Sequence, residues 1–178
     1  LIYRVYTRNQ DSQEEFIDGV LNEHNEIEHD KELQPEWLDT LEGLYTPRRY
    51  LQSALQMSAA YLLQIAPAST ITACAGFQEG DEFRWLQRIA YRTRELQIAR
   101  PERGFGQSAR DNWEKAPAFQ GLRELMEKAL IAYDWGESFV ANNLVAKVAA
   151  DETLRELVAT ARSFGDPVLA SLADNQLR

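Results

Sequence analysis

The sequence predicts an all-α helix bundle. Apolar residues recur at three- and four-residue spacing over long stretches, no stretch has the two-residue alternation of a strand, and proline or glycine separates successive stretches. With 178 residues, of which 44% are hydrophobic, the chain is long enough for one sizeable core, whereas a second full domain is not expected. We therefore expect a single helical domain over residues 1–178.

The first helices are bounded by a capping box and by prolines. Residues 12–15 read Ser-Gln-Glu-Glu, which is typical of a helix start and predicts a helix that runs towards Leu33. Pro35 ends this helix in the prediction. Pro47 suits the first position of a second helix, because its nitrogen has no hydrogen to leave unpaired, and this helix runs to about Ile65.

A third helix is predicted to start at Ser69 or Thr70, directly after Pro67. One stripe of side chains follows it at three- to four-residue spacing, and the stripe includes a carboxylate among apolar residues. Its members are Ile71, Cys74, Gln78, Glu82, Trp85, Ile89 and Leu96.

Glycines and prolines interrupt the helical pattern again beyond this stripe. The segment 100–106 contains Arg-Pro and Gly-Phe-Gly, after which Ser108 and Pro117 offer new helix starts. Residues 134–136, Asp-Trp-Gly, interrupt or kink the helix that follows, and Gly165 can adopt a left-handed cap at the end. The last predicted helical face is carried by Val140, Leu144, Val148 and Leu154.

Composition excludes several classes of partner and compartment. A formal net charge of −9 and a pI near 4.8 argue against nucleic acid or an anionic membrane as the main partner. No stretch approaches the ~18 consecutive apolar residues of a membrane span. The single cysteine, Cys74, allows no internal disulfide framework, which fits a reducing cytoplasm.

Helix bundles build di-iron sites from Glu-x-x-His pairs, because residues three apart share a helix face. Here the motif occurs once, from Glu26 to His29, and the only other histidine is His24. A carboxylate-bridged di-iron centre needs two such motifs on different helices. We therefore interpret residues 26–29 as an exposed acidic helix end.

Two further segments have the motif's shape but the wrong last residue. Glu82 is followed by Trp85, and Glu152 is followed by Arg155, at the position where a histidine would stand. Neither an indole N–H nor a guanidinium has a lone pair to give to iron. We interpret these four residues as degenerate ligand positions, with an inward Arg155 as a possible partner for a buried Glu82. Ordinary amphipathic helices whose Asp-Glu pairs face water remain the alternative.

Several longer strings, in the same order, resemble the hydroxylase β subunit of bacterial multicomponent, soluble di-iron monooxygenases, closest to the toluene monooxygenase branch. The resemblance covers essentially the whole chain. The strings are residues 45–50 (YTPRRY), 66–71 (APASTI), 84–85 (RW), 90–96 (AYRTREL), 120–128 (QGLRELMEK), 134–137 (DWGE), 143–145 (NLV) and 174–177 (DNQL).

The resemblance implies a ferritin-like (ribonucleotide reductase-like) bundle without metal ligands. In that family the α subunit holds the di-iron centre, so no catalytic, cofactor-binding or metal-ligating residue carries over to this chain. It also implies an assembly of two αβγ protomers, on which an effector protein, a reductase and in some branches a ferredoxin act. Such a complex inserts one oxygen atom of O₂ into an aromatic or alkene hydrocarbon, with NADH as the electron donor. The β subunit's implied role is to support α and to help form the dimer.

The chain departs from the family pattern in two respects. Family β subunits are considerably longer, and this chain begins without methionine, so we expect it to be the central part of a longer subunit. Val148 stands where the family leads us to expect a proline, which leaves the local kink open. Two other functions also remain open: a stand-alone ferritin-like metal-binding enzyme with Glu26, Glu28 and His29 as partial ligands, and a helical adaptor unrelated to oxygen chemistry.

Overall fold

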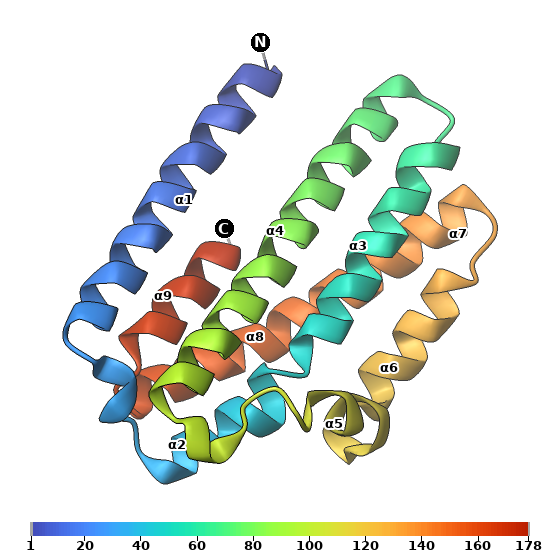
Figure 1. Cartoon of the computed structure of the whole chain (residues 1–178). Helices are drawn as coiled ribbons and strands as arrows, with labels where there is room; N and C mark the ends of the chain where they lie inside the picture. Colours follow the sequence, from blue (N-terminus) through green and yellow to red (C-terminus); the bar gives the residue numbers. More distant parts are fainter. Residues whose placement is uncertain (1, 178) are drawn as a thin grey trace. The chain divides into compact units, whose positions relative to one another are not determined.

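The computed structural model describes residues 2–177, and within that range it contains helices and connecting turns but no strand (Figure 1). The chain divides into two compact units, the first made of Leu1–Trp37 with Thr153–Arg178 and the second of Leu38–Glu152. The all-α prediction is confirmed. The expectation that residues 1–178 form a single domain remains a prediction.

Unit 2 is built around an antiparallel helix pair, α3 (Arg48–Ile65) and α4 (Ser69–Ala99), which lie side by side in Figure 1. Pro67 lies in the connection, where the lack of an N–H and the fixed φ favour a chain reversal over a continued helix. The predicted bounds of both helices are close to the observed ones. Ala68 occupies the N-cap of α4 in an extended conformation, without a side-chain cap.

A second helical layer packs on α3. It consists of α6 (Pro117–Leu130), α7 (Trp135–Phe139), the π-helix η4 (Val140–Ala146) and the start of α8 (Lys147–Ser163). Two hydrogen bonds fix the antiparallel register of α3 against this layer: Arg48 Nη2 donates to the Ala150 carbonyl at 3.1 Å, and Tyr61 Oη donates to the Tyr133 carbonyl at 2.8 Å. Between these bonds, small residues allow close packing. The buried cluster consists of Leu51, Ala54, Leu55, Met126, Ala129, Ala146 and Ala150.

The two π-helices are the main local departure from the predicted pattern. One is η2 (Leu41–Tyr45), directly after α2 (Pro35–Thr40), and the other is η4. A π turn contains an extra residue, which rotates the following helix by about 100° relative to an uninterrupted α-helix. Of the face predicted from Val140 to Leu154, Val140, Leu144 and Val148 are exposed, and only Leu154 is buried.

Unit 1 packs the long helix α1 (Ile2–Glu26) against the short helix α9 (Pro167–Gln176), through a cluster of Ile17, Leu21, Val168 and Leu172. The prediction of a helix from Ser12 to Leu33 is wrong at both ends. Helical periodicity continues upstream of Ser12, which is exposed inside α1, and the chain leaves the helix at Glu28, whose φ is 54°. The helix α9 was not predicted.

Shorter elements connect these helices: η1 (His29–Lys31), η3 (Pro101–Arg103) and α5 (Ala109–Lys115). The Gly-Phe-Gly break is confirmed, because Gly104 and Gly106 both have positive φ, which costs a glycine little. Gly165 likewise takes its predicted left-handed conformation. Among residues 2–177, no helix is both long and apolar enough to cross a membrane.

Candidate functional site

Glu82 carries the buried carboxylate of unit 2. It lies in the middle of α4 and is 2% exposed, whereas its neighbour Asp81 is partly exposed and pairs with Arg84 at 2.7 Å. Gln52 of α3 donates an amide N–H from Nε2 to Glu82 Oε2. The Lys147 ammonium, at the first turn of α8, lies 3.7 Å from Glu82 Oε1 and 3.0 Å from Asp151 Oδ1. Side chains from three helices thus meet at one carboxylate.

Burial dominates the electrostatics of this cluster. Removal from water raises the pKa of Glu82 above its ordinary value, and the negative charges of Asp151 and Asp81 raise it further. The nearby Lys147 ammonium opposes this effect and lowers the same pKa. Gln52 and Lys147 both present N–H donors to Glu82, so the carboxylate faces an ammonium and an amide.

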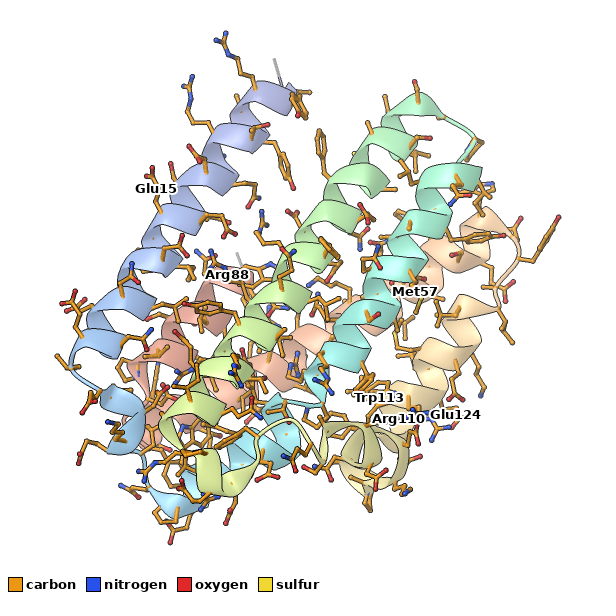
Figure 2. All side chains as sticks on the ribbon, in the orientation of Figure 1. Glu15, Met57, Arg88, Arg110, Trp113 and Glu124 are labelled. Carbon is orange, nitrogen blue, oxygen red and sulfur yellow. The ribbon has the colours of Figure 1, made fainter. Side chains whose placement is uncertain are left out.

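Arg48 is a second buried charge near the start of α3. Its guanidinium donates to the Ala150 carbonyl of α8, and burial lowers its pKa to about 10, while Tyr45 and Asp151 raise it. Next to it, Tyr50 stacks on Trp113 of α5 with the ring centroids 6.4 Å apart (Figure 2 labels Trp113). The string of residues 45–50 thus anchors the start of α3 to α5 and α8.

The four degenerate ligand positions have different surroundings. Glu82 and Trp85 lie one turn apart on the buried face of α4, and the guanidinium of Arg84 lies 5.7 Å from the centroid of the Trp85 ring. Glu152 and Arg155 are exposed. Within unit 2, the Glu82 carboxylate has the Gln52 amide and the Lys147 ammonium as its neighbours.

The single Glu-x-x-His motif lies at the end of α1. Glu26 and Glu28 are exposed, Glu28 pairs with Lys31 at 2.5 Å, and His29 Nε2 lies 3.8 Å from Asp166 Oδ1. His24 packs edge-on against His29. Within residues 2–177, no three His, Cys, Asp or Glu side chains come together in a group that could hold a metal ion.

Sequence reasoning missed Gln52 and Lys147. A signal for Lys147 was present, because Lys147 and Asp151 have the i,i+4 spacing of a helical ion pair. Gln52 lies among the apolar positions of α3, where a polar side chain indicates a buried partner. Neither signal identifies Glu82 as the partner.

Three buried polar side chains of unit 2 have no hydrogen-bond partner in the described chain. They are Ser58 of α3, Ser138 of α7 and Asn142 of η4. Helical hydroxyls elsewhere in the chain, such as those of Thr93 and Thr72, donate to the carbonyl four residues earlier. Ser58 and Ser138 do not use that local acceptor.

An apolar surface runs along α7, η4 and the start of α8. Phe139 and Val145 contribute to it, and Leu144 is 62% exposed at its centre. Scattered exposed apolar residues are ordinary, but several of them along consecutive helices are typical of an interaction surface. We call this set the 135–148 surface, and its members are Trp135, Phe139, Val140, Leu144, Val145 and Val148.

Comparison with known proteins places this fold in a family. A profile described as methane/phenol/alkene hydroxylase matches residues 1–177. The chain belongs to the methane/phenol/alkene hydroxylase family. The resemblance drawn from the sequence strings is thereby confirmed.

One relative within the methane/phenol/alkene hydroxylase family is the hydroxylase component subunit beta of the toluene-4-monooxygenase system of Ectopseudomonas mendocina. It is 46% identical over 179 residues, which cover 100% of this chain and 55% of the relative. The chain therefore spans about half the length of that relative.

Solved structures of hydroxylases show the same fold. A structure of toluene 4-monooxygenase with toluene in its resting active site superposes with a TM-score of 0.95 at 47% identity, covering 99% of this chain and 59% of that one. The crystal structure of xenon-pressurised phenol hydroxylase from Pseudomonas sp. OX1 gives a TM-score of 0.78 at 19% identity, covering 97% and 52%. At that identity the second likeness shows the fold alone. The ferritin-like bundle predicted from the resemblance is confirmed.

Proposed function

We propose that this chain is a non-catalytic, structural β subunit of a di-iron hydroxylase complex. The observation that carries the proposal is the state of Glu82, the buried carboxylate of the α4 stripe, which faces Lys147 and Gln52. A metal-binding carboxylate needs neighbours with lone pairs, whereas both of these neighbours present N–H groups. The relative at 46% identity, a hydroxylase component subunit beta, supports the same role.

The complex proposed here has its di-iron centre in a partner α subunit, and it contains γ subunits and a second αβγ protomer. An effector protein and a reductase, with a ferredoxin in some branches, act on the complex in the cytoplasm. The reaction inserts one oxygen atom of O₂ into an aromatic or alkene hydrocarbon, with NADH as the electron source, and toluene is the first substrate to test. The names of the relatives support this reaction class.

We further propose that the 135–148 surface contacts a partner subunit. Leu144 and Val148 lie on consecutive turns, so together they offer an apolar ridge to a groove or helix of the partner. The buried residues Asn142, Ala146 and Ala150 lie on the opposite side of the same elements. Burying the ridge would stabilise the complex at about 25 cal/mol per Å² of apolar surface removed from water.

Reconstitution tests this function. The chain is expressed with and without a partner chain that contains two Glu-x-x-His motifs, and the assembled material is separated by size-exclusion chromatography. Iron and toluene hydroxylation should appear only where the partner is present. Hydroxylation by this chain without any partner would support the stand-alone enzyme instead, and failure to assemble with such a partner would support the adaptor.

A further inference from the structure

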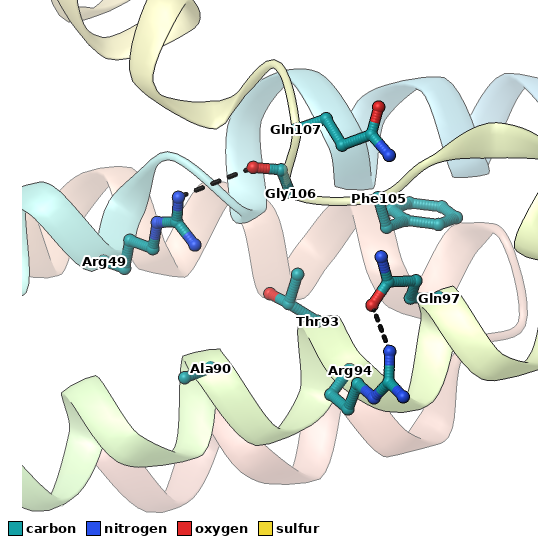
Figure 3. A pocket seen from close by; sticks show the side chains of 8 residues that line it. All are labelled: Arg49, Ala90, Thr93, Arg94, Gln97, Phe105, Gly106 and Gln107. Atoms are coloured by element: carbon teal, nitrogen blue, oxygen red, sulfur yellow. Dashed lines mark hydrogen bonds between the residues drawn. The ribbon is translucent and has the colours of Figure 1, made fainter.

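A pocket of about 310 Å³ opens between α3, α4 and the loop that precedes α5 (Figure 3). Its polar lining consists largely of N–H donors. Arg49 comes from α3, Arg94 and Gln97 come from α4, and Gln107 comes from the loop. No aspartate or glutamate is among the lining residues. The pocket lies within unit 2 and shares no residue with the Glu82 cluster.

The two arginines of the pocket have no carboxylate partner in the described part of the chain. Arg49 donates only to Tyr50 Oη at 3.1 Å and, at a long 3.5 Å, to the Gly106 carbonyl. Arg94 donates to Gln97 Oε1 at 2.6 Å, as Figure 3 shows. Each guanidinium has five N–H groups, so both keep unused donors. Other basic residues of unit 2 do pair with carboxylates: Arg84, Arg103, Arg110, Lys115, Arg123, Lys128 and Lys147.

This contrast is informative because the chain is acidic. With 28 acidic against 19 basic residues, carboxylates outnumber cations, and helical arginines readily find an acidic neighbour one turn away. Two guanidiniums without a carboxylate partner therefore give this pocket a positive charge that no acidic side chain of the described chain neutralises. Arginine's planar fork matches a carboxylate bidentately, which favours an anion with two coplanar oxygens.

The pocket also has an apolar wall, which narrows the class of anion. The Ala90 methyl group forms this wall together with the small accessible part of Phe105, which is 2% exposed, and Figure 3 shows the Phe105 ring next to Gln97. A carboxylate on a short aliphatic stem can place its stem on this wall, whereas inorganic phosphate has no apolar part to bury. The volume is ample for a stem of two or three carbons.

The loop that closes the pocket depends on glycine. Gly106 has a φ of 83°, and a Cβ at this position would lie 3.0 Å from Thr93 Cγ2. Its carbonyl accepts a long hydrogen bond of 3.5 Å from Arg49, so the loop both borders the pocket and contacts one guanidinium. The loop therefore gives the pocket a wall beside the partly buried Arg49, whereas Arg94 is an exposed side chain.

We propose that this pocket binds a carboxylate group carried on a short aliphatic stem, through the guanidiniums of Arg49 and Arg94. The group can come from a free dicarboxylate or from an acidic side chain of another subunit, and both sources present the same chemistry to the pocket. Binding of the free carboxylate does not depend on the proposed hydroxylase function.

Succinate is the probe for the free source. We expect isothermal titration calorimetry of the full chain to give a millimolar Kd that weakens at high salt. The double variant R49Q/R94Q should bind about tenfold more weakly or not at all. The matched control is R110Q, because Arg110 is an exposed helical arginine that already pairs with Glu114 at 2.7 Å (labelled in Figure 2).

The assembled complex distinguishes the two sources. If a partner's acidic side chain fills the pocket, R49Q/R94Q weakens assembly about tenfold while R110Q does not, and succinate competes with assembly. If the ligand is free, the complex binds succinate as the chain does. The proposal is overturned if succinate does not bind and R49Q/R94Q assembles normally, or if phosphate binds more tightly than succinate. Failure of the chain to assemble with any hydroxylase partner would count against the proposed function only.

Discussion

The Lys147 ammonium lies 3.7 Å from Glu82 Oε1 and 3.0 Å from Asp151 Oδ1, so one lysine serves a buried and a partly exposed carboxylate. Glu82 and Lys147 come from α4 and α8, and Gln52 of α3 completes the group. The ammonium offsets part of the cost of burying a carboxylate, which would otherwise favour its neutral form. The stability of unit 2 and its dependence on pH should therefore both respond to this pair.

Glu82→Gln tests the charge of the buried carboxylate. Burial raises the pKa of Glu82 in the folded chain, so the folded state binds more protons than the unfolded state between the two pKa values. The contribution of Glu82 to stability therefore falls as pH rises through that window. We expect the Glu82→Gln variant to lack this loss of stability with rising pH. At pH 8 it should be about 1 kcal/mol more stable than the unmodified chain, measured by urea denaturation.

The matched control for this variant is Glu79→Gln. Glu79 lies on the same helix and also accepts from a glutamine, Gln56, at 2.6 Å, but its carboxylate is only partly buried. The control should leave the pH profile close to that of the unmodified chain. A difference in stability between Glu82→Gln and the unmodified chain that does not change with pH would contradict the assignment.

Lys147→Met removes the cation and keeps most of the apolar stem. We expect a loss of about 2 kcal/mol at pH 8, less than for a fully buried pair because the lysine side chain is 26% exposed. The loss should shrink as pH falls, because protonation of Glu82 removes the charge that Lys147 offsets, and it should also shrink in the Glu82→Gln background. A double-mutant cycle by urea denaturation measures this coupling, and strictly additive effects would show that the pair is not coupled.

Asp166→Ala tests the anchor of unit 1. Asp166 caps α9 by accepting from the Leu169 N–H at 2.9 Å, and it also accepts from Trp37 Nε1 at 2.9 Å. Its loss removes a cap and leaves a buried indole N–H unpaired, which should cost about 3 kcal/mol in thermal or chemical denaturation. Asp134→Ala is the control, since Asp134 caps α7 at an exposed position and should cost about 1 kcal/mol. Equal costs would contradict the role of the Trp37 bond.

Leu144→Asp tests the 135–148 surface. Leu144 is 62% exposed, so the variant should keep the thermal midpoint of the isolated chain within a few degrees. Assembly with the partner subunit should weaken by about tenfold or more, because a carboxylate would be buried against an apolar groove. Ile27→Asp, at an exposed apolar position of unit 1, is the control. Unchanged assembly of Leu144→Asp would place the interface elsewhere.

Sequence periodicity predicted the helices whose pattern is unbroken. The bounds of α3 and α4 follow from Pro47 and Pro67, and the stripe of α4 correctly placed Glu82 and Trp85 on the buried face. The Ser-Gln-Glu-Glu string at residues 12–15 lies inside α1 and does not begin it. The predicted start of this helix was therefore wrong. Local sequence signals determine a helix end only where the helix itself cannot continue, as at proline.

The π-helix η4 limited the prediction of the second layer. An extra residue per turn changes which residues share a face, and no residue type in Val140–Ala146 announces it. The pairing of Lys147 with Glu82 was not predicted either, since a long-range pair depends on how two helices are rotated against each other. The sequence could therefore predict that Glu82 is a buried carboxylate that needs a partner. Identifying that partner required the three-dimensional structure.

Iron binding by the purified chain tests the central claim most directly, namely that Glu82 is held by Lys147 and Gln52 and that oxygen chemistry belongs to a partner subunit. The chain is incubated with ferrous iron without any partner, desalted and assayed for bound iron and O₂ consumption. We predict neither stoichiometric iron nor O₂ consumption, for the unmodified chain and for Trp85→His alike, because one imidazole does not complete a ligand set. Uptake of about two iron atoms per chain with activation of O₂ would contradict this account.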